Sequence, residues 1–259
     1  WFLKIEINLF SVIIVYTFSR FLTFIIATLY LKKTYNPIFI KGAIDKSMIK
    51  MARPLLFVSA TTLLSSSIDI IMLGWLSNSS SVGLYTVATR LVLFIAFFLQ
   101  ITNSAISPKI AALFANNQLK EINIMVKQVT LWLIIIGALS TVFFLLLGKP
   151  ILSFWGDEFT QAYYCLIILC FGQFINISTG CSGVLLIMSG NEKVFSYISG
   201  ISLLLNFVFN FVLITKYGIV GAAIATSITI AGENIVRVII AKKKTGILTT
   251  PLGLKKLKN

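Results

Sequence analysis

The 259-residue sequence is 58% hydrophobic and only 12% charged, and its mean hydropathy is +0.96. Soluble domains have roughly 45–50% apolar and about 25% charged residues, so this composition is typical of a membrane protein. The formal net charge is +14. The basic residues lie beside apolar stretches, which favours an anionic membrane surface over nucleic acid as their counterpart.

Histidine and cysteine usage excludes several chemistries. The sequence has no histidine, the commonest metal ligand and general base, so we expect no metal site, no cofactor and no enzyme, although carboxylate or lysine chemistry stays open. Cys165, Cys170 and Cys181 lie inside apolar segments without the spacing of a metal site, and they are interpreted as small buried residues.

Seven stretches are long and apolar enough to cross a bilayer, whose core of about 30 Å needs roughly 20 helical residues. They are residues 9–31, 54–76, 84–107, 129–148, 162–188, 194–214 and 219–241. The sequence therefore predicts an all-α polytopic membrane protein with seven transmembrane helices. On alternate sides of these spans lie 16 and 3 lysines and arginines, which predicts a cytoplasmic C-terminus.

Two connections on the basic side are long. Residues 32–53 carry six basic residues and a break at Asn36–Pro37, and we expect them to lie on the inner leaflet. Residues 109–128 have apolar faces around Asn116–Asn117. They are interpreted either as an interfacial helical hairpin or as extended ends of the flanking spans.

Ionisable residues inside the spans need a reason, because each costs about 2.5–3.5 kcal/mol near a helix centre. Asp69 lies about 10 Å from the outer end of the second span, and Arg90 about 9 Å from the outer end of the third. A tight turn makes these helices neighbours. We therefore expect Asp69 and Arg90 to face each other or a shared cavity, with a static packing pair as the alternative.

Three further charges lie in the first and last spans. Glu233 and Arg237 are four residues apart and can pair along one helix. Arg237 is four residues from the end of its span, and we expect it to snorkel to the surface. Glu233 is a second carboxylate that could bind a proton or cation. Arg20 lies near the midplane, which suggests an anion in the pathway or a partner elsewhere in the protein.

Polar residues also form stripes on three predicted helices, where lipid would be an unfavourable neighbour. The stripes are Thr62, Ser65, Ser66 and Asp69; Gln173 and Asn176; and Ser199, Ser202, Asn206 and Asn210. Hydrogen bonding between helices explains any one stripe, whereas several together favour a hydrated cavity. Gly180 and Gly183 interrupt the fifth span and indicate close packing or a hinge.

Five segments in order resemble one known family. They are Asp-Ile-Ile-Met-Leu-Gly (69–74), Val-Gly-Leu-Tyr-Thr-Val-Ala-Thr-Arg-Leu (82–91), Ser-Pro-Lys-Ile (107–110), Ser-Gly-Asn-Glu-Lys (189–193) and Tyr-Gly-Ile-Val-Gly-Ala-Ala-Ile-Ala-Thr (217–226). The pattern resembles the second lobe of Wzx-like polysaccharide biosynthesis flippases, the oligosaccharide flippases of the MOP/MATE-like exporter superfamily.

This resemblance implies two pseudo-symmetric lobes around a central cavity. Residues 1–33 would then contain the last helix of the first lobe, 34–53 the interlobe linker, 54–241 a six-helix MATE-like lobe, and 242–259 a basic cytoplasmic tail. The sequence begins at Trp1 without a signal-peptide pattern. We therefore expect a fragment of a longer protein that lacks most of its N-terminal lobe.

The resemblance also implies a function in the bacterial cytoplasmic membrane. Such proteins translocate undecaprenyl-pyrophosphate-linked oligosaccharides, the repeat units of O-antigen, capsule or exopolysaccharide, by alternating access. The implied partners are this substrate, membrane lipids, the missing lobe and a coupling H⁺ or Na⁺, with no nucleic acid. The expected cavity residues are Arg20, Asp69, Arg90, Gln173, Asn176, Asn206 and Asn210, and the expected ion carriers are Asp69 and Glu233.

Two other functional classes stay open. A MATE-type drug or metabolite exporter would need acidic and aromatic groups in its cavity, whereas the membrane-embedded cations here outnumber the acids. A non-transporting scaffold of a polysaccharide assembly complex would tolerate alanine at Asp69, Arg90 and Arg20.

Overall fold

The computed structural model describes residues 9–34, 56–57 and 59–251, and the chain divides into two units, Trp1–Lys46 and Ser47–Asn259. The described part of the first unit is one exposed apolar helix, α1 (Leu9–Thr34). Nearly all of the expected linker, residues 34–53, and the last part of the expected tail, residues 252–259, lie outside the described residues.

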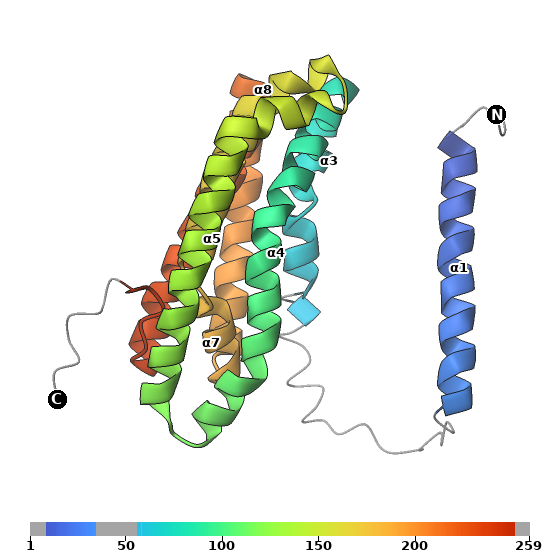
Figure 1. Cartoon of the computed structure of the whole chain (residues 1–259). Helices are drawn as coiled ribbons and strands as arrows, with labels where there is room; N and C mark the ends of the chain where they lie inside the picture. The colour runs from blue at the N-terminus through green and yellow to red at the C-terminus, as the bar shows by residue number, and fades with distance from the viewer. Residues whose placement is uncertain (1–8, 35–55, 58, 252–259) are drawn as a thin grey trace. The chain divides into compact units, whose positions relative to one another are not determined.

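The second unit is a helical bundle, with no strand among its described residues. Its elements are α3 (Ile68–Leu76), α4 (Ser79–Ala115), α5 (Leu119–Ser153), the 3-10 helix η1 (Asp157–Ala162), α6 (Tyr163–Ser178), α7 (Ser182–Met188) and α8 (Glu192–Thr245). Helix α6 packs against α4, α5 and α8. Figure 1 shows α4 and α5 running along the length of this bundle. The predicted all-α class is confirmed.

The described residues contain six helical segments long and apolar enough to span a membrane, against seven predicted spans. The difference lies in α8, where Gly218 has non-helical angles of φ 54° and ψ −131°. A Cβ added to Gly221 would lie 2.0 Å from the carbonyl oxygen of Leu213. Eight residues of straight helix would separate these positions by about 12 Å. Helix α8 therefore reverses, and its first limb (residues 192–217) and second limb (residues 219–245) contain the last two predicted spans.

The connection between α4 and α5 is a tight turn. Helix α4 continues to Ala115 and α5 starts at Leu119, and Asn117 takes a left-handed φ of 59° between them. The flanking helices therefore simply extend, as one of the two interpretations predicted. The apolar residues Ile110, Ile122 and Val126 of this segment are buried within the bundle.

Two predicted spans are broken. The helix described from Ser59 is interrupted by a turn at residues 66–67, where the Ser66 hydroxyl donates to the Leu63 carbonyl at 2.8 Å. The fifth span divides into α6 and α7 around Gly180, whose φ is +64°. A Cβ at Gly180 would lie 2.1 Å from the Thr130 hydroxyl oxygen. Gly180 thus allows both the turn and the close approach of α5.

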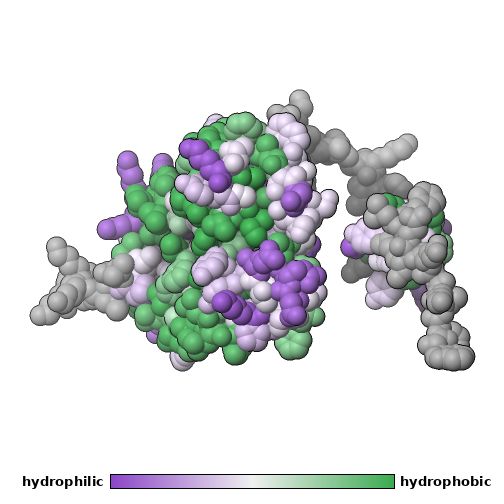
Figure 2. Space-filling view, turned by 90° about the horizontal axis from the view of Figure 1, so that it is seen from above, coloured by the Kyte–Doolittle hydropathy of each residue, from purple (hydrophilic) through white to green (hydrophobic). Residues whose placement is uncertain are grey.

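Apolar side chains fill the bundle and also cover its flanks. One buried cluster centres on α4, α6 and the turn of α8, and a second joins the α4–α5 turn region to α7 and the ends of α8. All three cysteines are buried, as expected. In the end-on view of Figure 2, most of the visible surface of the bundle is hydrophobic, and hydrophilic residues form a few groups among the hydrophobic ones. This distribution suits a multi-pass membrane protein.

The start of the expected basic tail is packed against the bundle. Gly246 caps α8 in the left-handed conformation, and Ile247 is only 2% exposed. The hydroxyl of buried Thr249 donates to the carbonyl of Thr179 at 2.8 Å. Residues 246–249 therefore join the end of α8 to the turn between α6 and α7.

Candidate substrate cavity

A polar cavity of about 420 Å³ lies inside the second unit. Its walls come from the segment around α3, from α4 and α6, and from both limbs of α8. The polar and charged residues among its lining are Thr62, Ser65, Ser66, Ser67, Asp69, Thr89, Arg90, Gln173, Ser202, Asn206, Thr226, Thr229 and Glu233. The three polar stripes of the sequence therefore meet at one cavity.

Asp69 is fixed in the cavity wall by neutral groups from three helical segments. Its Oδ2 accepts a hydrogen bond from the Tyr85 hydroxyl of α4 at 2.5 Å, and its Oδ1 accepts from the Ile70 amide at 2.9 Å. The hydroxyl of Thr226, on the second limb of α8, donates to Oδ2 at 3.4 Å. Asp69 is 5% exposed and Tyr85 is fully buried. No basic side chain of the described chain forms an ion pair with Asp69.

Arg90 does not pair with Asp69, although both residues line the same cavity. Helix α4 begins at Ser79, where Asn78 caps it by accepting from the Ser81 amide at 2.8 Å. The predicted span began at residue 84. With the true start, Tyr85 lies about 9 Å into α4 and Arg90 about 16 Å. Tyr85 therefore occupies the depth that matches Asp69. Arg90 is exposed and makes no ion pair with the described chain.

Glu233 and Arg237 form the predicted ion pair along α8, and both are mostly buried. The expectation that Arg237 snorkels to the surface is wrong. Its guanidinium donates to the Ser199 hydroxyl of the first limb at 3.0 Å and lies 4.2 Å from the centre of the Phe195 ring. These contacts hold Arg237 between the limbs, where it neutralises Glu233.

The predicted amides occupy two layers. Gln173 and Asn206 line the cavity. Asn176 and Asn210 lie behind them: the Asn176 amide donates to Gln173 Oε1 at 2.8 Å, and the Asn210 amide donates to Asn206 Oδ1 at 3.0 Å. The second pair of residues orients the first pair and does not line the cavity.

Arg20 lies in the first unit and contacts its own helix. Its guanidinium donates to the Tyr16 hydroxyl at 3.1 Å and lies 5.0 Å from the centre of the Tyr16 ring. The role of Arg20 in a cavity stays a prediction. Within the described part of the chain, no group of three or more acidic or cysteine side chains is arranged to hold a metal ion.

The cavity combines hydroxyl and amide groups with the charged side chains of Asp69, Arg90 and Glu233. Glu233 is paired with Arg237, and the carboxylate of Asp69 is already hydrogen-bonded, so Arg90 is the cavity cation that has no partner in the described chain. Hydroxyl and amide groups can bind sugar hydroxyls, and a free guanidinium can bind a phosphate oxygen pair. The arrangement suits a polar ligand that carries an anionic group.

The residues that contact Asp69 and Arg237 were not predicted from the sequence. Tyr85 and Thr226 hold Asp69, and Ser199 and Phe195 hold Arg237. Tyr85 was open to prediction, because it lies on the neighbouring helix at the depth of Asp69 once that helix is started at its Asn78 cap. Thr226 is 157 residues from Asp69 in the chain, and no local pattern connects them.

Comparison with known proteins assigns this bundle to a sequence family. The sequence model of the MatE family matches residues 54–212. The capsular polysaccharide biosynthesis protein CapF of Staphylococcus aureus is 29% identical over 77% of this chain and 52% of its own length. The probable low-salt glycan biosynthesis flippase Agl15 of Haloferax volcanii is 28% identical over 76% of this chain and 43% of its own.

A solved structure shares the fold. A MOP superfamily transporter from Pyrococcus furiosus superimposes with a TM-score of 0.60 at 18% identity, over 85% of this chain and 49% of that one. The chain therefore spans about half the length of each of these relatives.

Proposed function

The chain belongs to the MatE family, and on that basis we propose that it is part of a flippase that moves lipid-linked oligosaccharides across the cytoplasmic membrane. The names of two relatives, a capsular polysaccharide biosynthesis protein and a probable glycan biosynthesis flippase, support this substrate class. The substrate would be an undecaprenyl-pyrophosphate-linked repeat unit of O-antigen, capsule or exopolysaccharide. Its transport requires no bond to be made or broken, so the protein acts as a transporter and not as an enzyme.

The observation that carries the proposal is a cation without an ion pair in a cavity with polar walls. Arg90 is that cation, and hydroxyl and amide side chains line the same cavity. A pyrophosphate-linked sugar presents the complementary groups, because its phosphates accept charge-assisted hydrogen bonds and its hydroxyls bind neutral polar side chains. In the proposed cycle the head group enters the cavity from one side of the membrane and leaves toward the other.

The test removes the charge of Arg90 in a strain that depends on this protein for surface glycan. We expect Arg90→Gln to lower the export rate at least tenfold, because a hydrogen bond to a charged group contributes roughly 1.5–3 kcal/mol. Lys109→Gln is the matched control, since it removes one positive charge from the exposed surface of the same helix. Equal export by the two variants would contradict the role of Arg90.

Ion coupling is proposed at Asp69 in preference to Glu233. Glu233 is paired with Arg237, whereas Asp69 has only neutral donors, so no cationic side chain of the described residues competes with H⁺ or Na⁺ for it. In proteoliposomes, Asp69→Asn should abolish the dependence of transport on an imposed H⁺ or Na⁺ gradient, and Glu233→Gln should preserve it. The opposite pattern would assign coupling to Glu233.

The alternative is a MATE-type exporter of organic cations. Asp69 supports it, because a buried acid without a basic partner in the described chain could bind a cationic substrate. Ethidium efflux separates the two functions. A glycan flippase should not lower cellular ethidium, whereas an exporter should lower it in an Asp69-dependent manner. Normal glycan export by Asp69→Ala, Arg90→Ala and Arg20→Ala together would instead favour a scaffold.

The proposed topology places the C-terminus in the cytoplasm, with α1 as the last helix of a first lobe and residues 54–241 as the second lobe. The native cysteines are buried, so single introduced cysteines can report exposure with little background. Lys216→Cys should react with an impermeant maleimide in intact cells, and Asn117→Cys should react only after permeabilisation. The reverse labelling would invert the topology.

A further inference from the structure

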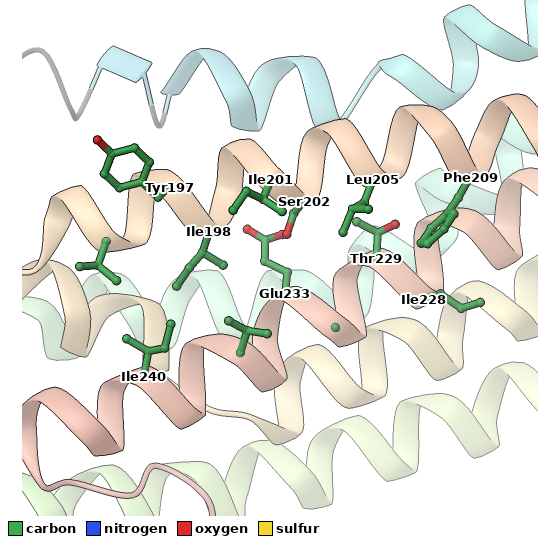
Figure 3. A pocket seen from close by; sticks show the side chains of 13 residues that line it. Tyr197, Ile198, Ile201, Ser202, Leu205, Phe209, Ile228, Thr229, Glu233 and Ile240 are labelled. Atoms are coloured by element: carbon green, nitrogen blue, oxygen red, sulfur yellow. The ribbon is translucent and has the colours of Figure 1, made fainter.

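A groove of about 480 Å³ lies between the two limbs of α8. Its walls are almost entirely apolar, and several of its residues, such as Ile201, Leu205 and Ile228, are exposed on the flank of the bundle. Its volume lies within the roughly 300–1,000 Å³ usual for small-molecule sites. Figure 3 shows apolar side chains at both ends of this groove.

The groove adjoins the polar cavity. Ser202, Thr229 and Glu233 line both spaces, and Figure 3 shows them in the middle of the groove between the apolar ends. The two spaces therefore meet at these three residues, with polar groups on the cavity side and apolar groups on the groove side.

This junction of groove and cavity lies between two contacts that join the limbs. On one side the reversal at Gly218 brings Gly221 against the backbone of Leu213. On the other side Arg237 of the second limb bonds to Ser199 of the first. The two limbs are thus in direct contact on both sides of this junction.

We propose that this groove holds the lipid chain of the lipid-linked oligosaccharide while its pyrophosphate and sugar head lies in the polar cavity. The inference rests on the proposed function, and it adds the place where the lipid chain of the substrate leaves the protein. A ligand that occupies both spaces must join an apolar chain to a polar anionic head. A soluble sugar or an organic cation would leave the groove unused, because its walls offer almost no polar group.

Gly232 provides a way to close the groove without disturbing the cavity. Gly232 lines the groove but not the cavity, and a Cβ added to it would meet no atom within 4 Å. Gly232→Leu therefore fills the groove, and it also raises helix propensity. Gly83→Leu in α4 is the matched control, because its added Cβ is equally free and Gly83 lines neither space.

The experiment uses the whole protein in proteoliposomes and two probes. One is a polyprenyl-pyrophosphate disaccharide with a diazirine on the isoprene unit next to the phosphate, and the other is the same head as a methyl pyrophosphate. We expect photo-crosslinks of the first probe at Ile228, Gly232 or Val236. Gly232→Leu should lower its translocation on the order of tenfold, the usual cost of adding a side chain to an occupied site. Binding of the methyl pyrophosphate should be unchanged.

The outcomes separate this inference from the proposed function. Crosslinks elsewhere, or equal translocation by Gly232→Leu and Gly83→Leu, would overturn the groove assignment while leaving a working flippase. A diazirine phospholipid that labels the groove and is not displaced by the substrate would also overturn it. Absence of translocation by the unmodified protein would overturn the proposed function and the groove assignment together.

Discussion

Asp69 and Glu233 are two carboxylates in the wall of one cavity, and the protein stabilises them in opposite ways. Asp69 is held by neutral donors from three helical segments, whereas Glu233 has a cation on its own helix. A buried ion pair removes the net charge, but neutral donors leave it in place. Two carboxylates in one cavity wall can therefore differ in what they can bind. Glu233 already has a cationic partner, whereas Asp69 has none among the described residues.

The largest expected effect comes from leaving Glu233 without its cation. Arg237→Gln should lower the free energy of unfolding in detergent by roughly 3 kcal/mol, because an uncompensated charge then stays buried. The double variant Glu233→Gln/Arg237→Gln should lose much less, and exposed Lys216→Gln should lose almost nothing. If the single variant were no less stable than the double variant, the ion pair would not be the reason why Glu233 is tolerated.

A smaller effect is expected at the neutral site. Tyr85→Phe removes the 2.5 Å hydrogen bond to Asp69 without changing the packing of the ring, and should cost about 2 kcal/mol of unfolding free energy. Tyr217→Phe is the control, because that side chain is exposed near the reversal of α8. A variant as stable as the control would mean that Asp69 draws its stabilisation from elsewhere.

The smallest effect is expected at Thr226. Its hydroxyl lies 3.4 Å from both Asp69 and the Tyr85 hydroxyl, near the limit of a hydrogen bond. Thr226→Val should therefore destabilise the protein by only about 0.5 kcal/mol in thermal unfolding. Thr215→Val, where the hydroxyl bonds only its own helix, sets the baseline. A loss as large as that of Tyr85→Phe would show that Thr226 is the main partner of Asp69.

The cavity could be predicted in part from single helices. The stripes through Thr62, Gln173 and Asn206 repeat at helical spacing, and the structure places them on one cavity. The Glu233–Arg237 pair was predictable for the same reason, because its two members are one turn apart. What these cases share is that the evidence lies within one helix.

The errors arose where a helix start or a distant partner mattered. Placing the start of α4 at residue 84 matched Arg90 to Asp69, whereas the start at Ser79 gives that position to Tyr85. Tyr85 and Arg90 are five residues apart on α4, which is more than one helical turn. Their side chains therefore differ both in depth along the helix and in direction around it. The position of Arg237 could not be predicted from its distance to the helix end, because Ser199 lies 38 residues earlier in the chain.

The sequence was sufficient to predict a helical membrane protein, because long apolar segments in a bilayer satisfy their backbone hydrogen bonds within a helix. It was also sufficient to predict which helix faces carry polar groups, since helical periodicity is a local property. The tertiary structure shows which of those faces meet, which carboxylate has a cationic partner, and that an apolar groove lies between the two limbs of α8. These features depend on contacts between residues far apart in the chain, where depth and packing select the partner.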